Sequence, residues 1–326
     1  MSLFTSQKTF AKYAWFTLAY NIFVVLLGAF VRATGSGAGC GGHWPLCNGE
    51  VIPQAPALET IIEFTHRMSS GLSAVFVALL LIAAWRIYPK GSLMRWGAIL
   101  SFVFILTEAL FGAGLVLFGL VQDNDSVARA VAIVLHLCNT FLLLGFLALT
   151  ARWATLGFSP QTKFNRPFGI LLLVGVVLMI VLGASGAITA LGETLFPSTS
   201  LAAGMQQDFS PTANFLLRLR VFHPVIAVSV GVYLSVLAFF IRQRSSHPKL
   251  HRATNWLEGL IGLQILLGLT NLILLAPIWM QLIHLAVTDL IWVSLVLLAE
   301  LWIGGRVSLE DRADHTIHEG INQPAS

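Results

Sequence analysis

Glu63, His66 and Arg67 bring three ionisable side chains together at the start of a long apolar run. Glu63 and His66 are three residues apart, so a helix would carry both on one face. Ionisable side chains inside a membrane-spanning segment are rare and commonly functional, because burying a charge in lipid is unfavourable. The competing interpretation is a helix end in water just outside the lipid, where these side chains would have no special task.

Of the nine histidines, four lie within apolar runs: His66, His136, His223 and His284. Each lies near the start of its run, and the runs alternate along the chain, so all four are expected at similar depths on one side of a membrane. A neutral imidazole is a good axial ligand for heme iron, and two on facing helices can hold one heme. A single buried histidine is more often a hydrogen-bonded core residue. Four at equivalent depths favour two heme sites, pairing His66 with His136 and His223 with His284.

The composition is that of an integral membrane protein. The 326 residues are 56% hydrophobic and 10% charged, and the mean hydropathy is +0.81, whereas soluble chains are about 45–50% apolar and about 25% charged. The first apolar run continues to spanning length without a small-residue cleavage site, so we expect no cleaved signal peptide. The net charge of +4 is small and does not indicate nucleic-acid binding. Eight runs are long enough to cross a bilayer, near 14–31, 62–88, 96–120, 130–152, 167–190, 221–241, 256–276 and 280–303.

The distribution of lysine and arginine predicts the orientation. Fourteen of the nineteen basic residues fall on one side of an eight-span chain: Lys8, Lys12, Arg86, Lys90, Arg95, Arg152, Lys163, Arg166, Arg242, Arg244, Lys249, Arg252, Arg306 and Arg312. Cytoplasmic loops carry the excess of basic residues. We therefore expect both termini in the cytoplasm, the histidines toward the extracytoplasmic side, and the chain in the cell inner (cytoplasmic) membrane.

The remaining basic residues, all arginines near the outer ends of spans, are Arg32, Arg67, Arg129, Arg218 and Arg220. Arginine can hold a carboxylate through two parallel hydrogen bonds, which lysine cannot. An outer rim with arginine but no lysine suggests an acidic, planar ligand. Small numbers and the chemistry of helix ends could also produce this pattern.

A glycine-rich segment, residues 34–42, leads into Cys40 and Cys47 in the first outer loop. A disulfide between these cysteines suits an oxidising compartment. A metal site that uses Cys40, His43 and Cys47 is the alternative, and it lacks an evident fourth ligand. Cys138 lies inside the fourth span, where a small core residue is expected.

The two halves of the chain resemble each other. The third span contains Glu108 followed four residues later by Gly112, and the seventh contains Gln264 followed by Gly268. We predict an N-terminal half (1–155), a cytoplasmic linker (156–166), a C-terminal half (167–305) and a cytoplasmic tail (306–326). Glu108 is interpreted as a packed polar or protonated group. Asp289 could accept a hydrogen bond from an axial histidine, although its spacing of five from His284 fits poorly.

Together, the glycine-rich segment with its two cysteines, Glu63 with His66 and Arg67, and the three later histidines resemble the heme A synthase family. The resemblance covers nearly the whole chain. It implies an all-α membrane protein in which eight transmembrane helices form two four-helix bundles related by a pseudo-twofold axis. It also implies oxidation of the C8 methyl of heme O to a formyl group, with water as the oxygen source, giving heme A for terminal oxidases.

The resemblance further implies roles for individual residues. The C-terminal histidine pair would hold heme b, the N-terminal pair would surround heme O, and Glu63 would be required for activity. Cys40 and Cys47 would match a pair that is disulfide-bonded in many bacterial members. On this basis Glu63 would accept a proton or stabilise positive charge. The heme propionates would meet arginines, with Arg67 and Arg32 or Arg129 in the first half and Arg218 or Arg220 in the second.

Other functions remain open from the sequence. A transmembrane electron carrier of the diheme cytochrome b type needs hemes near both faces, whereas all four histidines fall on one side. A non-catalytic heme-binding protein would explain the histidines and arginines but would give Glu63 no task. The expected partners are heme O and heme A, a heme O synthase and an unidentified electron acceptor, and the chain could form an oligomer.

Overall fold

The structure, a computed structural model, describes residues 6–156, 166–245 and 247–303. The described helices are α1 (Gln7–Ala33), α2 (Leu58–Ile87), α3 (Leu93–Leu117), α4 (Val127–Leu156), α5 (Arg166–Leu195), α6 (Leu201–Asp208), α7 (Phe215–Arg220), α8 (Phe222–Arg244), α9 (Pro248–Ile273) and α10 (Ile278–Ile303). Most of the predicted linker, the predicted tail, and Lys163, Arg306 and Arg312 lie outside the described residues.

Eight segments are long and apolar enough to cross a membrane, with α7 and α8 together forming the sixth. This confirms the all-α membrane fold and the eight predicted spans. Helices are favoured because lipid offers no hydrogen-bond partners to an exposed backbone. Serine side chains cap the starts of two of the spans: Ser6 accepts from the Thr9 amide in α1, and Ser92 accepts from the Arg95 amide in α3.

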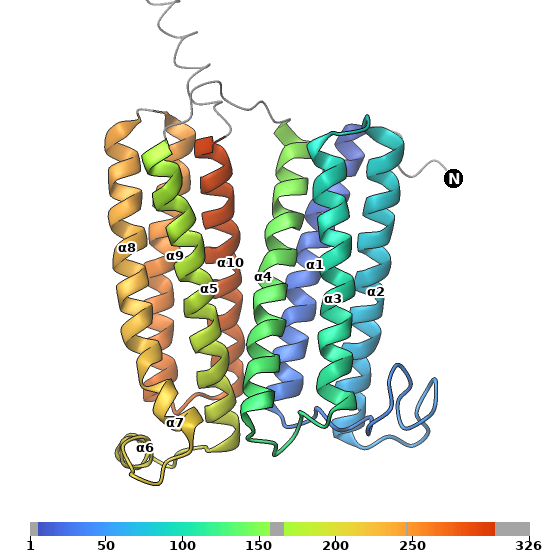
Figure 1. The fold of residues 1–326 in the computed structure, drawn as a ribbon, viewed down its shortest axis with the longest axis vertical. Coiled ribbons are helices and arrows are strands. Elements are labelled where there is room, and N and C mark those ends of the chain that lie inside the picture. The colour runs from blue at the N-terminus through green and yellow to red at the C-terminus, as the bar shows by residue number, and fades with distance from the viewer. Residues whose placement is uncertain (1–5, 157–165, 246, 304–326) are drawn as a thin grey trace, which may run out of the picture.

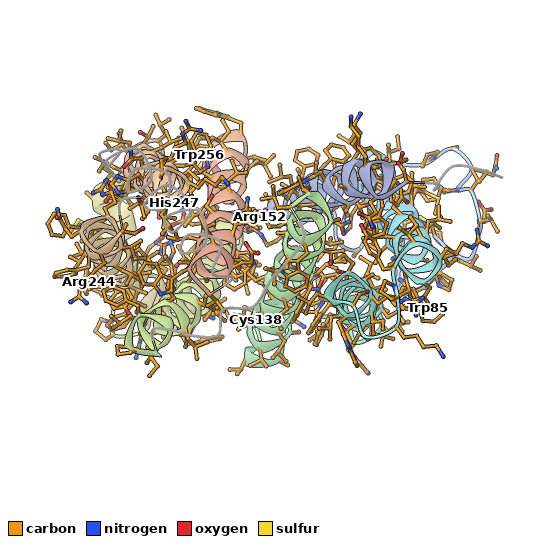
Figure 2. The ribbon with its side chains drawn as sticks, turned by 90° about the horizontal axis from the view of Figure 1, so that it is seen from above. Trp85, Cys138, Arg152, Arg244, His247 and Trp256 are labelled. Carbon is orange, nitrogen blue, oxygen red and sulfur yellow. A yellow bond between two sulfur atoms is a disulfide. The ribbon has the colours of Figure 1, made fainter. Side chains whose placement is uncertain are left out.

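The spans form two groups, α1–α4 on one side of the molecule and α5 with α8–α10 on the other (Figure 1). Viewed along the helices, the groups lie side by side, and Arg152 of α4 lies where they meet (Figure 2). This arrangement is consistent with the two predicted four-helix bundles.

The contacts between the halves follow a symmetric pattern. The contacting helix pairs are α4 with α5, α1 with α10, α4 with α10, and α1 with α5. If α1–α4 are matched with α5, α8, α9 and α10 in order, exchanging the halves converts the first pair into the second. The same exchange leaves the third and fourth pairs unchanged. A pseudo-twofold axis would produce this pattern, so the contacts support the predicted repeat.

An aromatic contact holds the two halves together near the middle of the membrane. The rings of Phe141 in α4 and Trp292 in α10 stack with centroids 4.9 Å apart, and the Trp292 indole donates to the Phe141 carbonyl oxygen at 2.6 Å. Gly183 of α5 makes room for this pair, since an added Cβ would lie 2.6 Å from the Phe141 ring. Both rings are almost fully buried, so the seam is packed as tightly as a core.

The loops that face away from the N-terminus carry structure that the sequence analysis did not predict. The long segment between α5 and α8 contains α6 and α7, of which α7 is the first part of the sixth span (Figure 1). Asn214, the N-cap residue of α7, donates to a carboxylate oxygen of Asp125 at 2.7 Å and so joins the loops of the two halves. In addition, α2 begins at Leu58 rather than near 62. Glu63 therefore lies in the second turn of the helix rather than at its mouth.

Candidate active site

All four candidate histidines lie at the same end of the molecule. They are six to nine residues from the first residue of their spans, which is roughly 9–14 Å along a helix. His66 and His136 lie on α2 and α4 of the first group of helices, and His223 and His284 lie on α8 and α10 of the second (Figure 1). Each half therefore holds two of the candidate imidazoles.

Three of these imidazoles pack against a glycine of the neighbouring helix. A Cβ added to Gly28 of α1 would lie 2.9 Å from the His66 ring, and one added to Gly186 of α5 would lie 3.1 Å from the His223 ring. In α9, a Cβ on Gly268 would lie 3.3 Å from the ring of His284. These distances are shorter than ordinary contacts, so the absence of a side chain at each glycine is what admits the ring. The first two pairs are equivalent under the repeat.

The fourth histidine, His136, meets a carboxylate instead. Its Nδ1 atom lies 3.4 Å from Oε1 of Glu108 on α3. Glu108 also accepts hydrogen bonds from the Thr140 hydroxyl and the Asn139 amide, both at 2.5 Å. Unlike the three glycines above, Gly112 of α3 does not contact a histidine ring, because nothing lies within 4 Å of a Cβ built on it. Glu108, for which the sequence suggested no task, is thus an immediate neighbour of a candidate ligand.

The equivalent position in the second half holds an amide. The Gln264 side-chain nitrogen lies 3.0 Å from Nε2 of His284 and donates to the Thr288 hydroxyl at 2.7 Å. Thr288 and Thr140 each follow their histidine by four residues. The two halves therefore share a histidine, a threonine and a polar partner. They differ in the chemistry of that partner, which is a carboxylate in the first half and a neutral amide in the second.

Glu63 is buried, with 3% of its surface exposed, and it joins α2 to the first outer loop. One carboxylate oxygen accepts from the Cys40 amide at 2.8 Å, and the other accepts from Nε and Nη2 of Arg67 at 3.0 and 2.5 Å. Arg67 also donates through Nη1 to the carbonyl oxygens of His43 and Leu46. The pair is therefore part of a clamp that holds the loop against α2.

The sulfur atoms of Cys40 and Cys47 are bonded to each other, which leaves neither thiolate for a metal ion. The loop they close lies directly on α2. The Thr60 hydroxyl donates to the Gly39 carbonyl at 2.7 Å, and a Cβ on Gly39 would lie 2.4 Å from the Glu59 backbone. Only glycine permits this approach, which explains part of the glycine enrichment in this segment.

Comparison with known families gives a match over nearly the whole chain. Residues 11–296 match COX15-CtaA, described as cytochrome oxidase assembly protein. The chain belongs to the COX15-CtaA family. The match includes all four histidines, Glu63 and both cysteines of the disulfide, and it confirms the resemblance noted from the sequence.

Individual relatives of this COX15-CtaA chain carry two different names. A protein of Thermus thermophilus named protoheme IX farnesyltransferase is 49% identical over 289 residues, which are 89% of this chain and 48% of that protein. A heme A synthase of Bacillus mycoides is 47% identical over 114 residues, 35% of this chain and 37% of that protein. A heme A synthase of Bacillus cereus is 45% identical over the same length. The chain spans about half the length of the Thermus relative.

The side chains of this COX15-CtaA chain fit axial ligation of a heme. The Nδ1 atoms of His66 and His284 are buried and lack a hydrogen-bond partner among the described residues, whereas Nδ1 of His136 faces the Glu108 carboxylate at 3.4 Å. The fourth, Nδ1 of His223, lies 2.9 Å from the Ser185 hydroxyl. A buried ring nitrogen without a partner is unfavourable. Histidine ligands commonly coordinate a metal with one nitrogen and donate from the other, so pairs of such rings suit bound iron.

Four of the five candidate propionate arginines are engaged with the chain's own loops. Arg67 holds the disulfide loop, Arg129 donates to the Gln122 and Asn124 carbonyls, and Arg218 donates to the Pro211 carbonyl. Arg220, the last of these four, is buried and pairs with two carboxylates, those of Asp208 at 2.7 Å and Glu193 at 3.4 Å.

Arg32 occupies a different position, because it connects the two halves. From α1 it donates to the Ala190 carbonyl and the Thr194 hydroxyl of α5, each at 2.5 Å, and to the Gln281 side-chain oxygen of α10 at 3.0 Å. These three acceptors are all neutral, so none of them balances the positive charge of Arg32. The sequence could not reveal this bridge, because Gln281 is 249 residues away and carries no charge.

Asp289 does not support the role considered for it. Its side chain is fully buried, and neither carboxylate oxygen has a hydrogen-bond partner among the described residues. No hydrogen bond joins it to His284 within the part of the chain that the structure describes. A helix turns a residue five positions on away from its partner, and this explains why the two side chains do not meet.

Proposed function

We propose that this chain is a heme A synthase, which oxidises the C8 methyl of heme O to a formyl group. The oxidation consumes one water molecule and releases four protons and four electrons for each methyl converted, so an electron acceptor outside the chain is needed. The observation that carries the proposal is the arrangement of two histidine pairs at one end of the molecule, one of which has carboxylates beside it. Membership of the COX15-CtaA family supports the same reaction.

We assign a different heme to each half of the chain. We assign heme O to the His66 and His136 pair, because Glu63 and Glu108 lie on this side and methyl oxidation releases protons that carboxylates can accept. We assign heme b to the His223 and His284 pair, where the neighbouring polar group is the neutral Gln264. A bound heme b would supply one-electron redox chemistry. The protein's own groups would hold its ring and tune its potential.

Glu63 is the candidate catalytic residue. It lies three residues before His66 on the same helix, and its carboxylate is shared between Arg67 and the Cys40 amide. A buried carboxylate held by fixed donors keeps its position as positive charge develops nearby, which favours electrostatic stabilisation. The disulfide loop would then act as the support that keeps Glu63 in place.

Among the five arginines, Arg32 is the strongest candidate for a propionate contact. Its present acceptors are neutral, so a carboxylate would be a stronger partner for the guanidinium. Since Arg32 connects the two halves, a propionate there would lie between the two heme sites. Arg220 already has two carboxylate partners and is the weakest candidate.

The proposed location is the cell inner membrane, with both termini in the cytoplasm and the histidines toward the outer side. The excess of basic residues on the face that carries the N-terminus supports this orientation. A heme O synthase is a proposed partner because it would supply the substrate. The Thermus relative that is named for farnesyl transfer is compatible with such a link.

That relative also favours a second candidate function, prenyl transfer to protoheme, and a non-catalytic heme-binding protein is a third. One experiment separates them. The chain is expressed in one host that makes heme O and in another that makes only protoheme, and the extracted hemes are identified by mass. Heme A in the first host alone supports our proposal. Heme O newly formed in the second host indicates prenyl transfer, and unchanged hemes in both hosts indicate binding without catalysis.

A further inference from the structure

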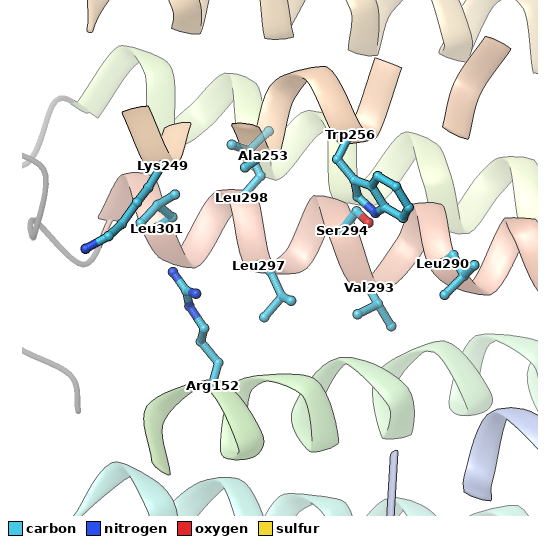
Figure 3. A pocket seen from close by; sticks show the side chains of 10 residues that line it. All are labelled: Arg152, Lys249, Ala253, Trp256, Leu290, Val293, Ser294, Leu297, Leu298 and Leu301. Atoms are coloured by element: carbon cyan, nitrogen blue, oxygen red, sulfur yellow. The ribbon is translucent and has the colours of Figure 1, made fainter. Parts of the chain in front are cut away.

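A groove of about 300 Å³ lies at the end of the molecule opposite the histidines, between α4, α9 and α10 (Figure 3). Its position is far from the candidate heme sites. Arg152, at its mouth, follows His136 on α4 by 16 residues, which is roughly 24 Å along a helix. Its lining residues are Arg152, Lys249, Ala253, Trp256, Leu290, Val293, Ser294, Leu297, Leu298 and Leu301.

Charge and apolar surface are separated along the groove. Arg152 and Lys249 come from different halves, and Figure 3 shows their cationic ends at the same end of the groove. Beyond them the lining is formed mainly by leucine and valine of α10. Arg152 also pairs with Glu300 at 3.1 Å. The mouth is suited to an anion, and the remainder is suited to a hydrocarbon chain.

The length of the apolar part matches one leaflet of a bilayer. Leu290 and Leu301 are 11 residues apart on α10, which corresponds to a rise of roughly 16 Å. Half of a hydrocarbon core of ≈ 30 Å is ~15 Å. The groove thus runs from the basic rim of the protein to about the middle of the membrane, as a lipid in that leaflet does.

We propose that this groove is a binding site for an anionic phospholipid. Its phosphate lies between Arg152 and Lys249, and one acyl chain follows Leu297, Val293 and Leu290. Basic pockets between transmembrane helices on the cytoplasmic side commonly bind anionic headgroups. Because the site takes one wall from each half, the lipid connects the two bundles at the end remote from the hemes.

The test counts lipids that stay bound to the intact protein by native mass spectrometry, after equilibration with equal amounts of phosphatidylglycerol and phosphatidylcholine. We expect the wild type to retain phosphatidylglycerol preferentially. Lys249→Gln should reduce that preference about fivefold, the factor that corresponds to ~1 kcal/mol for one basic residue near an anionic surface. Lys90→Gln is the matched control, because Lys90 is an exposed lysine of the α2–α3 loop on the same face, and it should leave the preference unchanged.

A second variant tests the acyl-chain part without altering charge. Leu297→Trp fills the groove and should reduce retention of the lipid while Lys249 and Arg152 stay in place. A parallel measurement distinguishes a lipid from free phosphate: phosphatidylglycerol should raise the thermal unfolding midpoint of the wild type in detergent, and inorganic phosphate should not. The proposal is overturned if both groove variants keep the wild-type lipid preference, if Lys90→Gln loses it equally, or if inorganic phosphate stabilises as well as the lipid.

Discussion

Glu108 lies 3.4 Å from the imidazole of His136, at the position where the second half of the molecule presents Gln264 to His284. A carboxylate next to an axial histidine makes the imidazole a stronger donor to iron and favours the ferric state. An amide in the same place increases the donor strength of the imidazole less. If each half binds one heme as proposed, the two hemes would have unequal electrostatic surroundings.

We expect Glu108→Gln to raise the midpoint potential of the heme bound by His66 and His136. A loss of ~1.4 kcal/mol of preference for the ferric state would raise a one-electron potential by about 59 mV. Spectroscopic redox titration of the purified protein measures this shift. The reciprocal variant, Gln264→Glu, should lower the potential of the other heme. Unchanged potentials in both variants would show that these side chains do not act on the iron.

Glu63→Gln should bind both hemes but form at least tenfold less heme A. The amide oxygen of glutamine can still accept from the Cys40 amide, so the loop should stay closed, while the negative charge is lost. Heme content and heme A yield are measured on the same preparation. Thr60→Val is the control, because it removes a loop contact to Gly39 without altering charge. If the glutamine variant makes heme A at the wild-type rate, Glu63 has no catalytic role.

Alanine at two glycines should empty the two heme sites separately. Gly28→Ala brings a Cβ to 2.9 Å from the His66 ring, and Gly186→Ala brings one to 3.1 Å from that of His223. Overpacking of this kind costs about 1–3 kcal/mol, which displaces the ring and weakens ligation. Pyridine hemochrome stoichiometry measures the heme content.

The control for these two variants is Gly262→Ala in α9, where nothing lies within 4 Å of the added Cβ. It should retain both hemes and gain roughly 0.5–1 kcal/mol of helix stability. Equal heme loss in the control would mean that the effect comes from helix packing in general.

Removing the disulfide should loosen the first outer loop more than the helices. With Cys40 and Cys47 seven positions apart, loop-closure entropy predicts a stabilisation of about 2.5 kcal/mol. The double variant Cys40→Ser, Cys47→Ser should be cut more readily by protease within residues 41–56, while the heme of the second half stays bound. Protection equal to that of the wild type would show that the Glu63–Arg67 clamp suffices.

The hydrophobic pattern and the composition of the sequence by themselves determine the helical membrane architecture. Runs of about 20 apolar residues can only be satisfied as helices in lipid, so the eight spans followed from the sequence, and the basic residues predicted their direction. The four histidines were found because each interrupts an apolar run at a similar depth. The resemblance to a family rested on these residues and on the cysteine loop, and it was confirmed.

Contacts between distant residues were decided by the tertiary structure. The sequence suggested that the five outer arginines bind an acidic ligand. In the structure Arg67 and Arg129 instead donate to loop carbonyl oxygens, and Arg220 pairs with carboxylates of the chain. Glu108 and Gln264 became interpretable only when α3 and α9 were seen beside the histidines. The local sequence determines the type of a side chain and its depth in the membrane. Its partner depends on how helices far apart in the chain pack together, because hydrogen bonds act over about 3 Å and not along the chain.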